Sequence, residues 1–239
     1  MPIILLLLIF SLSTPSFAKS VVVVVRAGAA LDSQFVDYEQ IATEFGWETE
    51  HFHISMEPLR ANHIRSYREL RRFIESLDDQ YSSITILGYS IGGKFAARAA
   101  RDLSIVDSVF LLDPVDGGPP ILPRLWPHLP VFMTPLRGQI EKPSWIIETE
   151  FAQNKGESRL RCVNRQLGAQ HFSKYVLEPQ LTFRFIADAG HLEVIRPPND
   201  NYEDPVLDTC PSGSRAIPDI VEEATGYWRE FLASQTDRN

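Results

Sequence analysis

The chain has 239 residues, of which 44% are hydrophobic and 23% charged, and its formal net charge at pH 7 is −8. This length and apolar content predict one globular domain with a sizeable core. The acidic balance argues against a nucleic-acid-binding surface, which would be basic.

Residues 1–18 have the features of a secretory signal peptide. Residues 3–10 form a short apolar run, and residues 16–18 resemble the small-residue pattern of a cleavage site. The usual positive charge ahead of the run is missing, so a signal anchor and a buried first strand are the alternatives. We expect entry into the secretory pathway, with the plastid and the extracellular space as destinations. There Cys162 and Cys210 would either pair or stay independent thiols, and they do not indicate a zinc site.

Strands alternate with helices along the remainder of the chain. In chain order, the residue patterns predict a strand at residues 20–25, a helix at 32–45, a strand at 47–54, a helix at 62–77, a strand at 83–87, a helix at 94–101, strands at 105–112 and 144–149, a short helix at 169–177, a strand at 181–186 and a helix at 217–233. This alternation indicates an α/β fold, with a mostly parallel sheet and helices on both faces. We expect a single domain over residues 19–239, in which the loops after the strands share one edge of the sheet.

Three of these helices have an apolar face that we expect to lie in the core. The residues on these faces are Phe35, Tyr38, Ile41 and Ala42 in the helix at 32–45, Ile64, Tyr67, Leu70, Phe73, Ile74 and Leu77 in the helix at 62–77, and Ile220, Val221, Ala224, Trp228, Phe231 and Leu232 in the helix at 217–233.

The segment at residues 117–143 differs in character from its surroundings. Residues 118–143 contain seven of the chain's 17 prolines, together with Trp126, Phe132 and Met133. Neither a helix nor a strand tolerates so many prolines, so a long apolar loop is expected. We interpret it as a lid or a substrate wall above the active edge, and simple packing against the sheet is the alternative.

The pattern at residues 82–100 predicts a catalytic serine. Residues 88–92 spell G-x-S-x-G between a predicted strand and a predicted helix. On such a turn the serine hydroxyl projects beyond the strand, and the helix start offers a backbone N–H to a developing oxyanion. This predicts Ser90 as a nucleophile and Ile91 as an oxyanion donor. A glycine-rich turn with a structural serine is the alternative.

A serine hydroxyl needs a base within hydrogen-bond reach. His191 follows the strand at residues 181–186, and Gly190 before it would let the loop bend toward Ser90. His191 is therefore the predicted base, and His171, on a predicted helix, is the main alternative. The remaining histidines precede the serine or lie in the loop: His51, His53, His63 and His128.

The base needs a carboxylate to orient it. Asp113 directly follows the strand at residues 105–112 and is the predicted acid. Asp116, three residues deeper into the loop, and Glu148 and Glu150, at the end of the next strand, are the alternatives.

A second oxyanion donor is expected in the loop after the first strand. The N–H of Ala27 is the predicted donor, and Gly28 is the alternative. Arg26 beside them is a candidate to orient an anionic substrate.

The whole array resembles the α/β-hydrolase superfamily and, more narrowly, the chlorophyllases. Residues 88–94 resemble the G-H-S-R-G-G-K elbow of that family, residues 113–117 match its D-P-V-D-G, and residues 187–195 are similar to its Y-G-H-x-D-x-L. Tyr89 and Ile91 depart from the family's His and Arg, and Glu193 stands where Asp is usual. A mature sequence beginning near Lys19 also leaves no room for the first two strands usual in the superfamily.

The resemblance implies a Ser90–His191–Asp113 triad that hydrolyses the phytyl ester of chlorophyll to chlorophyllide and phytol, with no metal or organic cofactor. The apolar loop independently favours an ester with a bulky apolar part, so the expected partner is a small apolar ester, either a pigment or a lipid, with peripheral contact to a membrane or lipid. A general carboxylesterase or lipase, and a non-catalytic binding protein on the same scaffold, are the alternatives.

Overall fold

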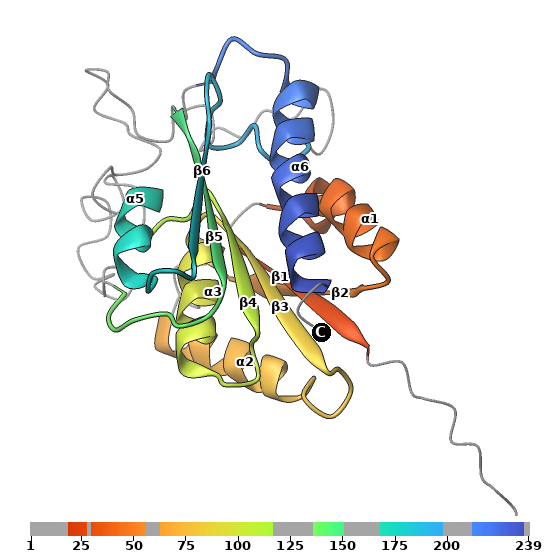
Figure 1. Cartoon of the computed structure of the whole chain (residues 1–239), viewed down its shortest axis with the longest axis vertical. Coiled ribbons are helices and arrows are strands. Elements are labelled where there is room, and N and C mark those ends of the chain that lie inside the picture. The colour runs from red at the N-terminus through yellow and green to blue at the C-terminus, as the bar shows by residue number, and fades with distance from the viewer. Residues whose placement is uncertain are drawn as a thin grey trace, which may run out of the picture.

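A parallel sheet organises the described part of the computed structural model, which comprises residues 19–27, 30–55, 63–116, 136–150, 168–197 and 212–236 (Figure 1). Its strands are β1 (Ser20–Ala27), β2 (Glu48–Ile54), β3 (Ser83–Tyr89), β4 (Ser108–Leu112), β5 (Ser144–Thr149) and β6 (Leu181–Ile186). They lie in the order β2-β1-β3-β4-β5-β6, and every neighbouring pair is parallel. The expected parallel sheet is therefore confirmed.

Helices cover both faces of this sheet, as the sequence predicts (Figure 1). The helical elements are η1 (Asp32–Phe35), α1 (Val36–Glu44), α2 (His63–Glu75), α3 (Ile91–Asp102), α5 (Ala169–Phe172), η4 (Ser173–Tyr175) and α6 (Ile217–Thr236). Helices α1 and α6 pack on one face, whereas α2, α3 and α5 pack on the other.

The strand β1 shows why the apolar runs are continuous. Val21, Val23 and Val25 face the core under α2 and α3, whereas Val22 and Val24 face the core under α1 and α6. Successive side chains of a strand point to opposite faces, so a strand covered on both faces must be apolar throughout.

Several boundaries differ from the predictions, including the following three. Strand β1 continues through Arg26 and Ala27, which we expected in a loop, because both residues pair with β2. Strand β4 begins at Ser108 rather than at residue 105, since the chain turns ahead of it. Helix α3 begins at Ile91, directly after the G-x-S-x-G serine.

The predicted core faces are buried in α1 and α6 but only in part in α2. Ile64 is 58% exposed, so its predicted place in the core is wrong. It lies in the first turn of α2, one turn ahead of Tyr67, where the helix first meets the core.

Several predictions fall outside the described residues: the signal peptide at residues 1–18, residues 117–135 of the proline-rich segment, Gly28, and both cysteines. Among the residues that are described, no helix combines the length and apolar character needed to cross a bilayer.

Candidate active site

Ser90 lies on a strained turn between β3 and α3. Its backbone angles are φ 54° and ψ −127°, which a residue with a side chain rarely adopts. Such strain persists only where the surroundings enforce it, and it is common at functional sites. The turn therefore has the backbone conformation expected for a nucleophile elbow.

Two glycines make the turn sterically feasible. A Cβ at Gly88 would lie 2.5 Å from the Cβ of Ala96, so the strand and the helix can approach only without a side chain there. A Cβ at Gly92 would overlap the carbonyl oxygen of Val25 on the neighbouring strand. The spacing of the glycines in the motif thus follows from the close packing of three backbone segments.

Ser90, His191 and Asp113 form one hydrogen-bonded chain. His191 Nε2 lies 2.9 Å from Ser90 Oγ, and His191 Nδ1 lies 2.6 Å from Asp113 Oδ2. Because a carboxylate only accepts, Nδ1 carries the ring proton and Nε2 is left to accept the hydroxyl proton. The imidazole therefore has the tautomer and orientation that a general base requires.

The Asp113 carboxylate is held by the end of the neighbouring strand β5. The Thr149 hydroxyl donates to Asp113 Oδ2 at 2.8 Å, and the Thr149 N–H donates to Oδ1 at 3.3 Å. Asp113 is 1% exposed and has a φ of 44°. A buried carboxylate with these donors stays in one orientation toward the imidazole.

The loop that carries His191 is held by hydrogen bonds within the loop and by hydrogen bonds to the segment before α6. The Glu193 carboxylate accepts the N–H of Gly190 at 2.5 Å and that of Gly213 at 2.9 Å. Asp188 accepts the Ser214 N–H at 2.9 Å. These contacts explain a buried glutamate at position 193, since two backbone N–H groups donate to its Oε2 atom.

The structure separates the alternative base and acid from the Ser90 array. His171 Nε2 lies 2.9 Å from Asp116 Oδ2, and Tyr175 lies 3.3 Å from the same nitrogen. Asp116 also forms an ion pair of 2.6 Å with Lys94 and accepts the Leu136 N–H at 2.8 Å. Burial lowers the pKa of Lys94, and the Asp116 charge partly opposes this shift.

Glu148 and Glu150, the other candidate acids, accept hydrogen bonds from other groups. Glu148 Oε2 accepts a hydrogen bond from Gln170 at 3.2 Å, and Glu150 Oε2 accepts the Asp188 N–H at 2.9 Å. His191 meets Asp113 instead.

The candidate oxyanion donors flank the elbow. Ile91 opens α3 immediately after Ser90. Val25 pairs with Gly88, so the register places Ala27, two residues on, level with Ser90. The guanidinium of Arg26, the candidate to orient an anionic substrate, binds Asp32 at 2.6 Å and the carbonyl of Ala30.

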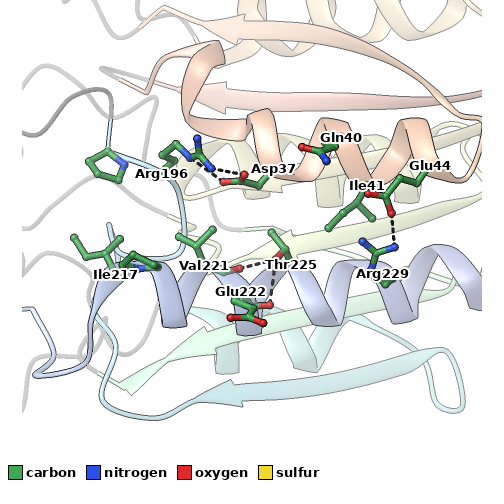
Figure 2. Close-up of a pocket in the computed structure, with 12 residues that line it drawn as sticks. Asp37, Gln40, Ile41, Glu44, Arg196, Ile217, Val221, Glu222, Thr225 and Arg229 are labelled. Atoms are coloured by element: carbon green, nitrogen blue, oxygen red, sulfur yellow. Dashed lines mark hydrogen bonds and ion pairs between the residues drawn. The ribbon is translucent and has the colours of Figure 1, made fainter.

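A separate surface groove lies between α1 and α6 (Figure 2). Its volume is about 620 Å³, with an apolar floor that includes Ile41 and Val221. The Asp37–Arg196 and Glu44–Arg229 ion pairs lie along it. Neither Ser90 nor its partners line this groove, which therefore lies outside the candidate active site.

The described residues contain no group of three or more histidine, cysteine, aspartate or glutamate side chains that could hold a metal ion.

Solved structures share this architecture. MGS-M1, an alpha/beta hydrolase enzyme from a Medee basin deep-sea metagenome library, is 12% identical over 90% of this chain and 85% of its own, with a TM-score of 0.58. Est1E from Butyrivibrio proteoclasticus is 13% identical over 94% and 90%, with a TM-score of 0.57. The Pyrococcus furiosus esterase Pf2001 is 12% identical over 91% and 84%, also at 0.57.

The chain therefore has the α/β-hydrolase fold. No protein-family profile and no curated protein sequence matches it. At 12–13% identity the structural likeness establishes the fold, and the chemistry rests on the geometry of the site.

Sequence reasoning missed two contacts of the site. Thr149 binds Asp113, and the ring of Tyr89 stacks on His191 with centroids 5.2 Å apart. Tyr89 lies within the elbow motif, so a bulky aromatic residue beside the serine was a signal that could have been used. Thr149 carries no comparable local signal.

Proposed function

We propose that this protein is a serine esterase that hydrolyses carboxylic esters, with Ser90 as the nucleophile. The hydrogen-bonded chain from Ser90 through His191 to Asp113, on a strained turn, is the observation that supports this most directly. The esterases that share the fold support the same class of reaction by analogy.

In the proposed acylation step, Ser90 Oγ attacks the ester carbonyl carbon while His191 Nε2 takes its proton. The carbonyl π electrons move to oxygen, and the Ile91 and Ala27 N–H groups stabilise the oxyanion. When the intermediate collapses, the ester bond breaks and the alcohol leaves with the proton from His191. Asp113 accepts the Nδ1 proton in a hydrogen bond and stabilises the imidazolium.

Deacylation repeats the same steps with water. His191 takes a proton from water, and the hydroxyl attacks the acyl carbon. The bond to Ser90 Oγ then breaks, and the proton returns to Ser90 as the acid is released. These steps use no metal ion or organic cofactor.

For the substrate, we propose an ester with a bulky apolar part, and more narrowly the phytyl ester of chlorophyll, which gives chlorophyllide and phytol. The support is the chlorophyllase-like motif at residues 113–117 and the apolar, proline-rich segment at 117–143. A carboxylesterase or lipase acting on other apolar esters is the alternative. Peripheral contact with a lipid surface fits both, and we propose secretory routing through residues 1–18.

Turnover of a short p-nitrophenyl ester tests the reaction. Ser90→Ala and His191→Ala should abolish turnover while thermal unfolding stays cooperative. Ser82→Ala, an exposed serine next to the same strand, is the matched control and should retain full activity. A fluorophosphonate probe should label the wild-type protein and not Ser90→Ala. Unchanged turnover in Ser90→Ala would contradict the proposal, and absence of labelling would favour a non-catalytic binding protein.

Incubation with chlorophyll, with triacylglycerol and with short acyl esters tests the substrate. Chromatography should show chlorophyllide in the wild-type reaction and none with Ser90→Ala. If only the lipid or short esters are hydrolysed, the pigment assignment is wrong and the esterase assignment stands.

A further inference from the structure

Tyr89 is the last residue of β3 and directly precedes Ser90. Its ring lies on the His191 imidazole, with centroids 5.2 Å apart and an interplanar angle of 18°. Its hydroxyl donates to the main-chain carbonyl of His191 at 3.0 Å. One side chain therefore contacts both the ring face and the backbone of the same histidine.

The position of Tyr89 is itself tightly fixed. The residue is 3% exposed, and the ring of Phe35 meets it edge-on with centroids 5.9 Å apart. Burial and, secondarily, the charge of Asp113 raise the pKa of Tyr89 well above its ordinary value. The phenol thus stays protonated and remains a donor wherever an esterase of this kind would work.

The other groups that face His191 act on the edge of its ring or on its loop. Asp113, from the end of β4, binds Nδ1, and Ser90, from the elbow, binds Nε2. Glu193, on the same loop as His191, binds the N–H of Gly190. Tyr89 differs from all of them because it lies against the face of the imidazole.

An aromatic face attracts a cation, and more strongly where water is excluded. The imidazole becomes a cation as Ser90 loses its proton, so the stacked ring interacts more favourably with the charged form. The phenol hydroxyl meanwhile holds the backbone from which the imidazole projects.

Resting on the proposed function, we propose that Tyr89 is a positioning residue for His191: its ring favours the imidazolium that forms during attack by Ser90, and its hydroxyl fixes the histidine loop. The two parts of the side chain can be removed one at a time.

Steady-state kinetics separate the two roles. Tyr89→Leu removes the ring, so kcat should fall about 3- to 30-fold with KM nearly unchanged. Tyr89→Phe keeps the ring and loses only the hydroxyl, so kcat should fall less, roughly 2- to 10-fold. A wild-type kcat in Tyr89→Leu would overturn the proposal.

Nuclear magnetic resonance gives a readout that needs no activity. In protein with ¹³C-labelled histidine, the Cε1–H signal of His191, identified by its loss in His191→Gln, should carry a ring-current shift from Tyr89. Tyr89→Leu should remove that shift, whereas Tyr89→Phe should preserve it. An unchanged signal in Tyr89→Leu would overturn the proposal.

These measurements also separate this inference from the function on which it rests. If the signal behaves as expected but no ester is hydrolysed, the proposed esterase function is wrong and the effect of Tyr89 on His191 stands. Tyr89→Met, which fills the volume with an unbranched chain, replaces Tyr89→Leu if the latter does not fold. The wild-type signal alone decides whether the rings stack.

Discussion

Replacing Thr149 with valine should weaken both the fold and the candidate active site. Thr149 is fully buried at the end of β5, and its hydroxyl donates to Asp113 Oδ2 at 2.8 Å. Valine has nearly the same shape as threonine, so the substitution removes a hydrogen-bond donor without opening a cavity. The Thr149 N–H and His191 Nδ1 would remain as donors to the carboxylate.

The size of the effect follows from the burial of Asp113. A hydrogen bond to a charged group contributes about 1.5–3 kcal/mol, and at 1% exposure water does not replace the lost donor. The free energy of unfolding should therefore fall by about 1.5–3 kcal/mol. If Asp113 then orients His191 less well and the same free energy is lost from the transition state, kcat/KM would fall by roughly 10- to 100-fold.

Urea denaturation and p-nitrophenyl ester turnover measure the two effects on the same preparations. Thr149→Ser keeps the hydroxyl and is the matched control, so it should retain most of the activity. If Thr149→Val had wild-type stability and a wild-type rate, the Thr149 hydroxyl would play no part in holding Asp113, and the reasoning would be refuted.

Four further substitutions test the packing and charge arguments. Gly92→Ala should destabilise the protein by about 1–3 kcal/mol or more in urea denaturation, because the added Cβ would meet the β1 backbone. Gly226→Ala in α6, where the added Cβ would meet open space, should stabilise the protein by about 0.5–1 kcal/mol. Equal effects of the two substitutions would contradict the argument that strand and helix approach closely at Gly92. Asp116→Asn should destabilise the protein by about 3–5 kcal/mol, since Lys94 is left buried without its carboxylate partner, and a loss below 1 kcal/mol would refute this. Burial raises the pKa of Asp102, but hydrogen bonds from Arg101 and Tyr67 outweigh burial and hold the pKa below its ordinary 3.8. Its carboxylate therefore stabilises the fold above that pH, and the stability difference between Asp102→Asn and wild type should shrink as pH falls through the folded-state pKa; a difference that does not change with pH would contradict this.

The strands were predictable from sequence where local signals agree. Strands β5 and β6 have the predicted bounds, because each is a short apolar or alternating run set between polar segments. The end of β1 was not predictable in this way. Arg26 resembles a loop residue by composition, but it pairs with His53 of β2, and Asp32 neutralises its charge.

The residues of the candidate site were likewise predictable where the sequence carries a pattern, and not elsewhere. The order of serine, acid and histidine along the chain indicates which strand ends to compare, and the structure brings together Ser90, Asp113 and His191 from segments up to 101 residues apart. Thr149 was missed because its role depends on β5 lying beside β4, which no local pattern encodes. The same holds for the ion pair between Lys94 and Asp116, since lysine in a helix is usually expected at the surface.

The loop that carries His191 has to cross part of the sheet edge to reach Ser90. Strands β3 and β6 are separated by β4 and β5 in the sheet, so their ends lie about 14 Å apart at the usual spacing of strands. Yet His191, which follows β6, lies 2.9 Å from Ser90, which follows β3. The loop after β6 must therefore return across two strand ends and be held there.

The contacts that hold this loop come from outside the reacting groups. Glu193 fixes it to the segment before α6, Tyr38 of α1 donates to the carbonyl of Val194 at 2.6 Å, and Tyr89 fixes the carbonyl of His191. Trp228 of α6 in turn donates to the carbonyl of Tyr38 at 2.9 Å. The layer formed by α1 and α6 thus positions the candidate base, which explains why buried hydroxyl and indole donors occur in this layer.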